Sequence, residues 1–181
     1  MKELSLHILD IGQNSVSAGA ALIEIEIIED HTQDILSIKI IDNGCGMDEE
    51  TVRKVIDPFY TSRTTRKVGL GVPMFKANAE QCSGTFKIES QLGVGTVVEA
   101  TFQHSHIDRV PLGDMPETIM AMVMANASGE LVYRHTLDSR NFTFDTREIR
   151  EVLGDDVPLD SLDVLLWIKG HVEEGLQELV E

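Results

Sequence analysis

Residues 57–74 form the one clearly basic run in an acidic chain. After Asp57 the next acid is Glu80, and between them the chain passes through Gly69-Leu70-Gly71 into a predicted helix. Glycines let a backbone approach a ligand closely, and a helix N-terminus directs free N–H groups at an anion. We interpret this run as a lid over the phosphates of a nucleotide, with a solvated loop as the alternative. Three cations are candidates for phosphate contacts: Arg63, Arg66 and Lys67.

Three other short stretches carry polar side chains suited to a ligand. Asp10 and Asn14 stand four residues apart on a predicted helix, so both project from one face. Asp42 ends a predicted strand and begins a glycine-rich turn, and the pair Gly95-Thr96 opens another strand. Each stretch alone has a structural alternative, such as a turn-forming Asp or an Asn that only faces solvent. Their meaning therefore depends on whether the fold brings them together.

The composition restricts the partners and the compartment. With 181 residues, the chain suits one domain, or one domain with an appendage, and its apolar fraction of 42% allows a sizeable core. The net charge of −16 argues against nucleic acid and an anionic membrane surface, because both are bound through basic faces. Two cysteines make no disulfide framework, the start carries no signal peptide, and no apolar run approaches the ~20 residues that span a bilayer. We therefore expect a cytoplasmic protein.

The hydrophobic pattern of residues 4–102 predicts helices interleaved with strands. Ile23, Ile25 and Ile27 alternate with acids, which is typical of a strand with one buried face. Asp48 is the expected N-cap of a short helix after the glycine-rich turn. The predicted helices are 4–18, 48–55 and 72–82, and the predicted strands are 21–28, 35–41, 85–89 and 95–102.

A segment with little pattern, residues 103–115, separates two predicted domains, 1–104 and 105–181. The second domain holds 16 acids against 6 bases, so most of the net charge lies there. We expect this acidic α/β extension to pack on the sheet or to bind a partner, with Trp167 in its core. Its predicted elements are helices 116–127, 146–153 and 160–180 and a hairpin of strands 130–137 and 141–145. The last helix carries an apolar stripe of Leu162, Leu165, Leu166, Val172, Leu176 and Leu179.

In order and spacing, the four stretches resemble the motifs of the GHKL superfamily of ATPases and kinases, also called the Bergerat fold. They read Asp10-x-x-x-Asn14, Asp42-x-Gly44-x-Gly46-Met47, Gly69-x-Gly71 and Gly95-Thr96. The superfamily includes DNA gyrase, mismatch-repair ATPases, large heat-shock chaperones and sensor histidine kinases. The resemblance covers roughly residues 4–102, and the run Asp57-Pro58-Phe59-Tyr60-Thr61-Ser62 is closest to the histidine kinase branch.

The resemblance implies an α+β fold, a two-layer α/β sandwich whose helices cover one face of a mixed sheet. The kinase version of this fold usually has structure before the asparagine helix, and few residues precede that helix here. We therefore expect the hairpin of residues 130–145 to pack against the sheet or extend it.

The resemblance also assigns roles to the helix residues. It implies that Asn14 ligates Mg²⁺, since an amide oxygen is the hard ligand that Mg²⁺ accepts beside phosphate oxygens and water. Asp10 stands where hydrolytic branches carry a glutamate that activates water. Because aspartate is about one methylene shorter, two interpretations stay open: a general base, or a residue that orders water or structure.

By the same resemblance, Asp42 reads adenine. A carboxylate accepts a hydrogen bond from the exocyclic amine of adenine, whereas guanine places a carbonyl oxygen there and two acceptors repel. Gly44 and Gly46 would let the backbone approach the base, with Met47 as an apolar wall and Thr96 nearby. The lid and the following helix start complete the implied nucleotide contacts: Arg63, Arg66, Lys67, Gly69, Leu70, Gly71 and Val72.

These features predict Mg²⁺-dependent ATP binding. ATP would be turned over by hydrolysis or by phosphoryl transfer to a partner protein, as in a histidine kinase-like, anti-sigma-type or ATPase domain. The alternative is a non-catalytic nucleotide sensor whose lid closure regulates a protein partner. An unidentified phosphoacceptor or protein partner is expected, and a second copy of the chain is a candidate for that partner.

Overall fold

The computed structural model describes residues 3–59 and 71–181. The described strands form one six-stranded sheet in the order β3-β4-β2-β1-β5-β6, in which only β1 and β5 run parallel. The strands are β1 (Leu22–Asp30), β2 (Ile35–Asp42), β3 (Phe86–Gln91), β4 (Gly95–Gln103), β5 (Glu130–Leu137) and β6 (Arg140–Asp145). The helices are α1 (Leu4–Ser17), α2 (Glu49–Ile56), α3 (Gly71–Gln81), α4 (Met115–Ala125), α5 (Thr146–Leu153) and α6 (Leu162–Val180).

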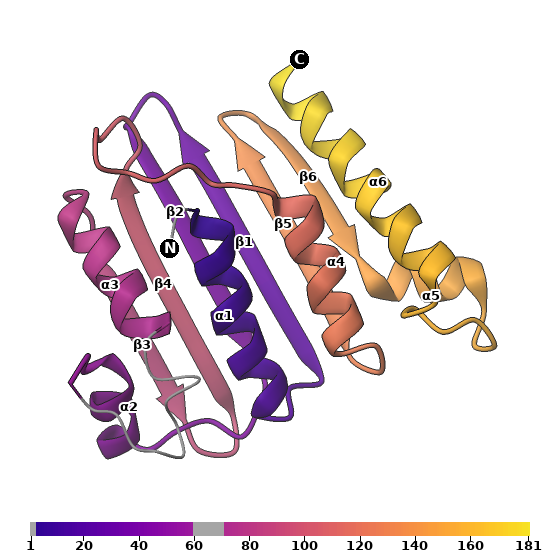
Figure 1. The fold of residues 1–181 in the computed structure, drawn as a ribbon, viewed down its shortest axis with the longest axis horizontal. Coiled ribbons are helices and arrows are strands. Elements are labelled where there is room, and N and C mark those ends of the chain that lie inside the picture. Colours follow the sequence, from indigo (N-terminus) through magenta and orange to yellow (C-terminus); the bar gives the residue numbers. More distant parts are fainter. Residues whose placement is uncertain (1–2, 60–70) are drawn as a thin grey trace.

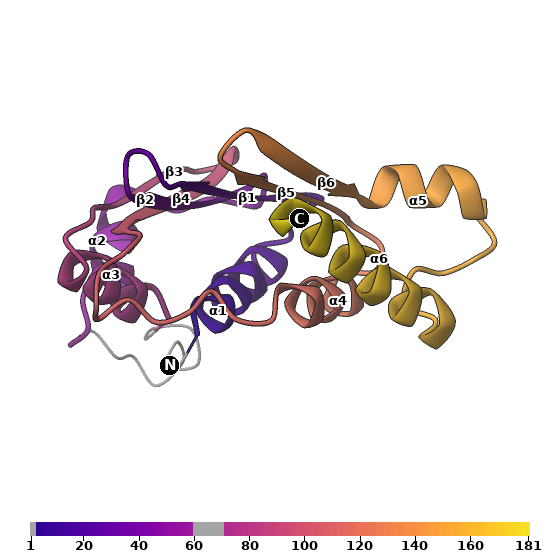
Figure 2. The ribbon, with the colours of Figure 1, turned by 90° about the horizontal axis from the view of Figure 1, so that it is seen from above.

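The molecule is a two-layer sandwich, which confirms the predicted fold class. Helices α1, α3, α4 and α6 lie side by side on one face of the sheet, and α5 extends from its end (Figures 1 and 2). The alternation in β1 explains this layering, because Ile23, Ile25 and Ile27 are fully or almost fully buried on the helical side. None of the helices among residues 3–59 and 71–181 is both long and apolar enough to cross a membrane.

Most local predictions agree with the structure to within one or two residues. Asp48 is the N-cap of α2, and its side chain accepts a hydrogen bond from the Thr51 N–H at 2.8 Å. The segment after β4 lacks regular structure, as its composition indicated, but it is tied to α1. The N–H groups of Leu4 and Ser5 donate to the carbonyls of Pro111 and Leu112 at 3.0 and 2.7 Å. These bonds satisfy two N–H groups at the start of α1.

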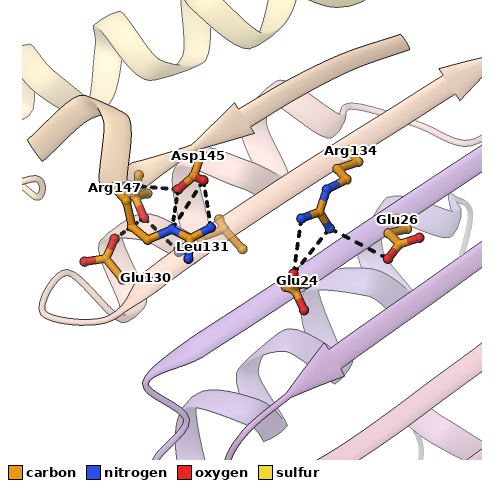
Figure 3. A network of polar contacts seen from close by, with 8 residues as sticks. Glu24, Glu26, Glu130, Leu131, Arg134, Asp145 and Arg147 are labelled. Carbon is orange, nitrogen blue, oxygen red and sulfur yellow. Dashed lines mark hydrogen bonds and ion pairs between the residues drawn. The ribbon is translucent and has the colours of Figure 1, made fainter. Parts of the chain in front are cut away.

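The hairpin of β5 and β6 extends the sheet, as predicted. β5 pairs in parallel with β1 along its whole length, from Glu130 opposite Leu22 to Leu137 opposite Glu29. On the face away from the helices, Arg134 of β5 reaches Glu24 and Glu26 of β1, with N···O distances of 3.3 and 3.7 Å (Figure 3). The sheet therefore runs continuously across the predicted domain boundary at residue 104, and the boundary itself stays a prediction.

The prediction for the last helix is partly wrong. Leu165, Val172 and Leu179 are buried as expected, but Trp167 is 52% exposed, and Leu162 and Leu166 are 71% and 55% exposed. The reason is that α6 packs on α4 and β6 through one narrow stripe. Side chains rotated away from that stripe face solvent whatever their polarity.

Candidate functional site

A cavity of about 320 Å³ opens between the helical layer and the sheet, at the end of the sheet where β2 stops. Asn14 and Asp42 both line it, so the two side chains on which the nucleotide hypothesis depends share one hollow. Four further predicted site residues also reach it: Gly46, Met47, Val72 and Thr96. The remaining lining residues are Ile11, Ser15, Ala18, Ile40, Cys45, Thr51, Lys54, Val55, Ile88 and Val98.

The Asp42 carboxylate is fixed from two sides. The Ser15 hydroxyl on α1 donates to Asp42 Oδ2 at 2.6 Å, and the Gly44 N–H donates to Oδ1 at 2.9 Å. Both donors are neutral, and the two carboxylate oxygens retain further acceptor capacity. Asp42 can therefore accept a hydrogen bond from a ligand in the cavity.

Strand register explains why Thr96 lies near Asp42. The two residues are direct cross-strand partners in the β2–β4 ladder, and two residues earlier in β2 Ile40 is paired with Val98. Val98 is in turn paired with Ile88 of β3. Residues two apart in a strand share a face of the sheet. The polar pair Asp42 and Thr96 therefore lies beside an apolar floor formed by Ile40, Val98 and Ile88. A flat, apolar base with polar edges fits such a floor.

The glycine-rich turn packs between α1 and the β3–β4 hairpin. Gly46 has a φ of 72°, and a Cβ there would stand 2.0 Å from the Gln91 carbonyl oxygen, so no other residue fits. The Cys45 N–H donates to the Ala18 carbonyl at 2.9 Å, which attaches the turn to the end of α1. The Met47 N–H donates to Ser90 Oγ at 2.7 Å, which attaches it to β3.

Ser90 was not predicted and does not itself line the cavity, yet it connects two residues that do, Met47 and Thr96. Its hydroxyl accepts from the Met47 N–H, lies 3.1 Å from the Gly95 carbonyl oxygen, and lies 2.8 Å from Thr96 Oγ1. The hairpin register provides the signal that could have identified it, because Ser90 stands directly opposite Thr96. Ser15, also missed, directly follows Asn14, and Lys54 lines the cavity from α2 while it pairs with Glu50 at 3.2 Å.

Asp10 lies beside the start of α3 and is not among the residues that line the cavity. A Cβ on Gly71, the first residue of α3, would stand 3.1 Å from the Asp10 Cβ. Burial raises the pKa of the Asp10 carboxyl above its ordinary value. A raised pKa strengthens a carboxylate as a base, although it does not distinguish a base from a residue that orders water.

One turn before Asp10, the His7 side chain is buried against α3. Its ring centroid lies 5.5 Å from that of Phe75, and neither ring nitrogen has a hydrogen-bond partner within residues 3–59 and 71–181. Burial lowers the pKa of His7 to about 4, so the imidazole is neutral near pH 7.

Five predicted lid residues lie outside the described part of the chain: Arg63, Arg66, Lys67, Gly69 and Leu70. Their assignment to phosphate stays a prediction. The described lid residue Val72 reaches the cavity, so the N-terminal turn of α3 stands at its edge.

The donor set suits Mg²⁺ better than a transition metal. In residues 3–59 and 71–181, no group of three or more His, Cys, Asp or Glu side chains is arranged to hold a metal. Asn14 lines the cavity, and its side-chain amide has one oxygen that can act as a ligand. Mg²⁺ is commonly held by one or two protein oxygens together with phosphates and water, so a single hard donor fits it.

Comparison with known proteins places these features in a family. The family model for histidine kinase-, DNA gyrase B- and HSP90-like ATPases matches residues 1–106. The sensor histidine kinase YvrG of Bacillus subtilis is 33% identical over 94 residues, which cover 50% of this chain and 16% of that kinase. A probable C4-dicarboxylate sensor kinase of Bacillus subtilis is 35% identical over 78 residues, or 43% of this chain and 15% of the kinase.

Among solved structures, the Aquifex aeolicus MutL ATPase domain complexed with ADP superposes with a TM-score of 0.51 at 16% identity. The match covers 84% of this chain and 69% of that one. At this identity the likeness concerns the fold. The described chain therefore spans only a small part of the sensor kinases that it matches but most of a related ATPase domain.

Proposed function

The chain belongs to the family of histidine kinase-, DNA gyrase B- and HSP90-like ATPases and contains its ATP-binding domain, and we propose that the cavity beside Asp42 binds ATP with Mg²⁺ and supports ATP turnover. Turnover takes place by hydrolysis or by phosphoryl transfer to a partner protein. The similarity to sensor histidine kinases supports the transfer. Cytoplasmic location is part of the proposal, because Cys45 and Cys82 are free thiols and a reducing compartment keeps thiols in that form.

The geometry of Asp42 is the observation that carries the proposal. Its carboxylate is oriented by the Ser15 hydroxyl and the Gly44 N–H, and Asp42 lines a hollow with mostly apolar walls. Adenine presents an amine to such an acceptor and guanine presents a carbonyl, so the site favours ATP over GTP. Gly46, Met47 and Thr96 line the same hollow and are the proposed neighbours of the base, whereas Gly44 is absent from the lining and acts through its hydrogen bond to Asp42.

Asn14 is the proposed protein ligand of Mg²⁺. When bound, the ion neutralises charge on the phosphates as the γ-phosphoryl group leaves. The chain itself supplies the positions: α1 holds Asn14 at the cavity, and α3 begins at Gly71 with Val72 in the cavity lining. The first turn of a helix has free N–H groups that can bind an anion, and Gly71 and Val72 are the proposed contacts there. Arg63, Arg66 and Lys67, with Gly69 and Leu70, are the proposed lid contacts.

Asp10 is the proposed general base. Burial raises the pKa of its carboxyl, which improves its ability to accept a proton from an attacking water or hydroxyl. Its absence from the cavity lining favours the second candidate function, a nucleotide sensor with negligible turnover. In that case ATP binding closes the lid over the site, and the closed lid changes an interface with a partner protein. Asp10 then only supports the start of α3.

Incubation with γ-labelled ATP and Mg²⁺, with and without cell extract, separates these functions. Label in inorganic phosphate indicates an ATPase, label in a protein indicates a kinase, and label that remains in ATP indicates a sensor. An Asp10→Asn variant that binds ATP but loses turnover supports the base, whereas unchanged slow turnover supports the sensor. Failure of the wild type to bind ATP contradicts the proposal as a whole.

A further inference from the structure

The outer face of α6 carries an apolar surface that the fold leaves uncovered. Leu162, Leu166 and Trp167 are each more than half exposed and lie within six residues of one another. They project away from the buried stripe of α6, which packs on α4 and the end of the sheet. Figure 1 shows α6 beside β6, at the side of the sheet opposite α2 and α3. Isolated exposed apolar residues are ordinary, but a group on one outer face indicates contact with another molecule.

Two glycines inside α6 have different environments. A Cβ on Gly175 would stand 2.2 Å from Cε1 of Phe142, so packing against β6 requires that glycine. A Cβ on Gly170 would meet nothing within 4 Å. Glycine weakens a helix interior relative to alanine, and at Gly170 no contact within the described chain compensates for this. Gly170 lies one turn beyond both Leu166 and Trp167, so it leaves bare backbone between two apolar side chains.

The Trp167 ring is held in place although it is exposed. It stacks on the imidazole of His171 with ring centroids 4.8 Å apart and planes 8° from parallel. His171 in turn contacts the rings of Phe142 and Phe144, with centroids 5.8 and 6.4 Å away. An aromatic side chain fixed before binding loses little conformational entropy on contact with a partner, and such residues dominate interface energetics.

Acidic side chains border this surface. Asp163, Glu173 and Glu174 of α6 are all exposed. The one basic residue of α6, Lys169, is paired with Glu117 of α4 at 2.7 Å. The border is therefore negative, and the whole chain has a net charge of −16. A second copy of the chain would bring like charges together, which disfavours self-association through this face.

We propose that this face of α6, formed by Leu162, Leu166, Trp167 and Gly170 with its acidic border, docks a basic amphipathic helix of a partner protein. An apolar side chain of that helix contacts the bare backbone at Gly170, between Leu166 and Trp167. Lysines and arginines beside it meet Asp163, Glu173 and Glu174. The face lies outside residues 1–106 matched by the family model, and the proposal does not rest on ATP binding.

Two synthetic helical peptides without tryptophan test the proposal. They share one leucine-rich face, and its flanks are Lys and Arg in one peptide and Glu in the other. Trp167 is the only tryptophan of the chain, so its fluorescence reports binding without a label. We expect the basic peptide to shift the emission to shorter wavelength with saturation, and the acidic peptide to have no effect. Added salt should weaken the binding of the basic peptide.

Variants separate docking from helix stability. Gly170→Ala should raise the melting temperature by about 2–4 °C, because alanine favours the helix, and should weaken peptide binding about tenfold because a methyl fills the contact. The double variant Glu173→Lys with Glu174→Lys should also lose affinity. The matched control is Glu148→Lys with Glu151→Lys on α5, which changes the net charge equally and should bind as the wild type does.

Three results would overturn the proposal. The first is equal binding of both peptides, or of neither. The second is equal loss of affinity in the α5 control, because binding would then follow net charge alone. The third is sedimentation of the wild type as a dimer that Leu166→Glu dissociates, which would assign the face to a second copy. An Asp42→Asn variant should dock the basic peptide normally, so failure of the ATP proposal leaves this result unaffected.

Discussion

The two ends of the sheet each fix a strand-end carboxylate with two hydrogen bonds, but the carboxylate at one end lines a cavity and the carboxylate at the other end is held by two histidines. At the cavity end, Asp42 accepts from a hydroxyl and a backbone N–H. At the opposite end of the neighbouring strand, Glu29 pairs with Nε2 of His135 at 2.8 Å and of His104 at 3.1 Å. The donors at the first end are small and local, whereas those at the second are bulky rings from β5 and from the segment after β4.

This difference determines what each end can do. Both oxygens of Glu29 are occupied, and Tyr133 closes the network through a 2.7 Å hydrogen bond to Nδ1 of His135. The His135 side chain is only 5% exposed. Glu29 therefore joins the ATP-binding domain to the C-terminal strands, while Asp42 keeps acceptor capacity beside a cavity. A carboxylate therefore holds two parts of the fold together at Glu29, and at Asp42 it can bind a ligand.

Replacing Asp42 with Asn gives the largest expected effect on ATP binding. The carboxylate becomes an amide with one acceptor oxygen, and a hydrogen bond to a charged acceptor is worth about 2–3 kcal/mol, so ATP affinity should fall on the order of 100-fold. Isothermal titration calorimetry with ATP and GTP measures this loss. The matched control is Glu29→Gln at the other end, which should leave the ATP Kd unchanged; equal losses in both variants would contradict the comparison.

The titration of His7 in α1 also makes the stability of the protein depend on pH, and this contribution must be separated from that of Glu29. Burial lowers the pKa of His7 from 6.5 to about 4, so the unfolded chain binds a proton in this range that the folded chain does not. Stability is then constant above pH 6.5 and falls as the pH decreases toward 4, by about 3 kcal/mol at most. Urea unfolding across this range should show the slope in the wild type and not in His7→Leu. A slope retained by that variant would assign it to other groups.

The Glu29→Gln variant should lose about 2 kcal/mol of stability near pH 7, because charge-assisted bonds to His135 and His104 are weakened. Those hydrogen bonds, the one from His135 first, hold the pKa of the Glu29 carboxyl below 4.5. A lowered folded pKa means that the stabilisation is complete above pH 4.5 and is lost as the pH falls through the lowered value. Chemical denaturation from pH 7 to 3 should therefore bring the variant and the wild type closer together, and parallel curves would refute this role.

The smallest expected effect concerns Ser90. Ser90→Ala leaves the Met47 N–H without its acceptor and removes the partner of Thr96, so ATP affinity should fall about fivefold, or about 1 kcal/mol. Ser90→Thr keeps the hydroxyl and should retain affinity. Calorimetry at one temperature distinguishes them. If alanine and threonine have the same effect, the hydroxyl does not orient the cavity mouth.

Local sequence patterns were sufficient for the elements. The alternation of Ile23, Ile25 and Ile27 fixes both the strand and the face that it buries, because the side-chain period of a strand is two. Asp48 predicts the start of α2, because its side chain accepts a hydrogen bond from an N–H group in the first turn of the helix. Trp167 was assigned wrongly to the core, because helical periodicity describes one face of α6 without saying how much of it a neighbour covers.

The candidate site could be predicted only in part. Asp42 and the glycine turn could be predicted because they are one of four stretches whose order and spacing resemble a known family, although alone they are typical of an ordinary turn. Ser15 and Ser90 were missed because serine is common and its role depends on which atoms come within hydrogen-bond reach. That reach depends on the packing of α1 and on the β3–β4 register, which the local pattern does not contain.

The sequence by itself determined the elements, the order of the four polar stretches and the acidity of the last 77 residues. These follow from backbone periodicity and charge, which are properties of neighbouring residues. Only the tertiary structure decided that Asn14 and Asp42 share a cavity, that β5 pairs with β1, and that α6 leaves an apolar face uncovered. Those outcomes depend on packing between residues far apart in the chain, where burial of apolar surface selects one arrangement among many that the same local patterns allow.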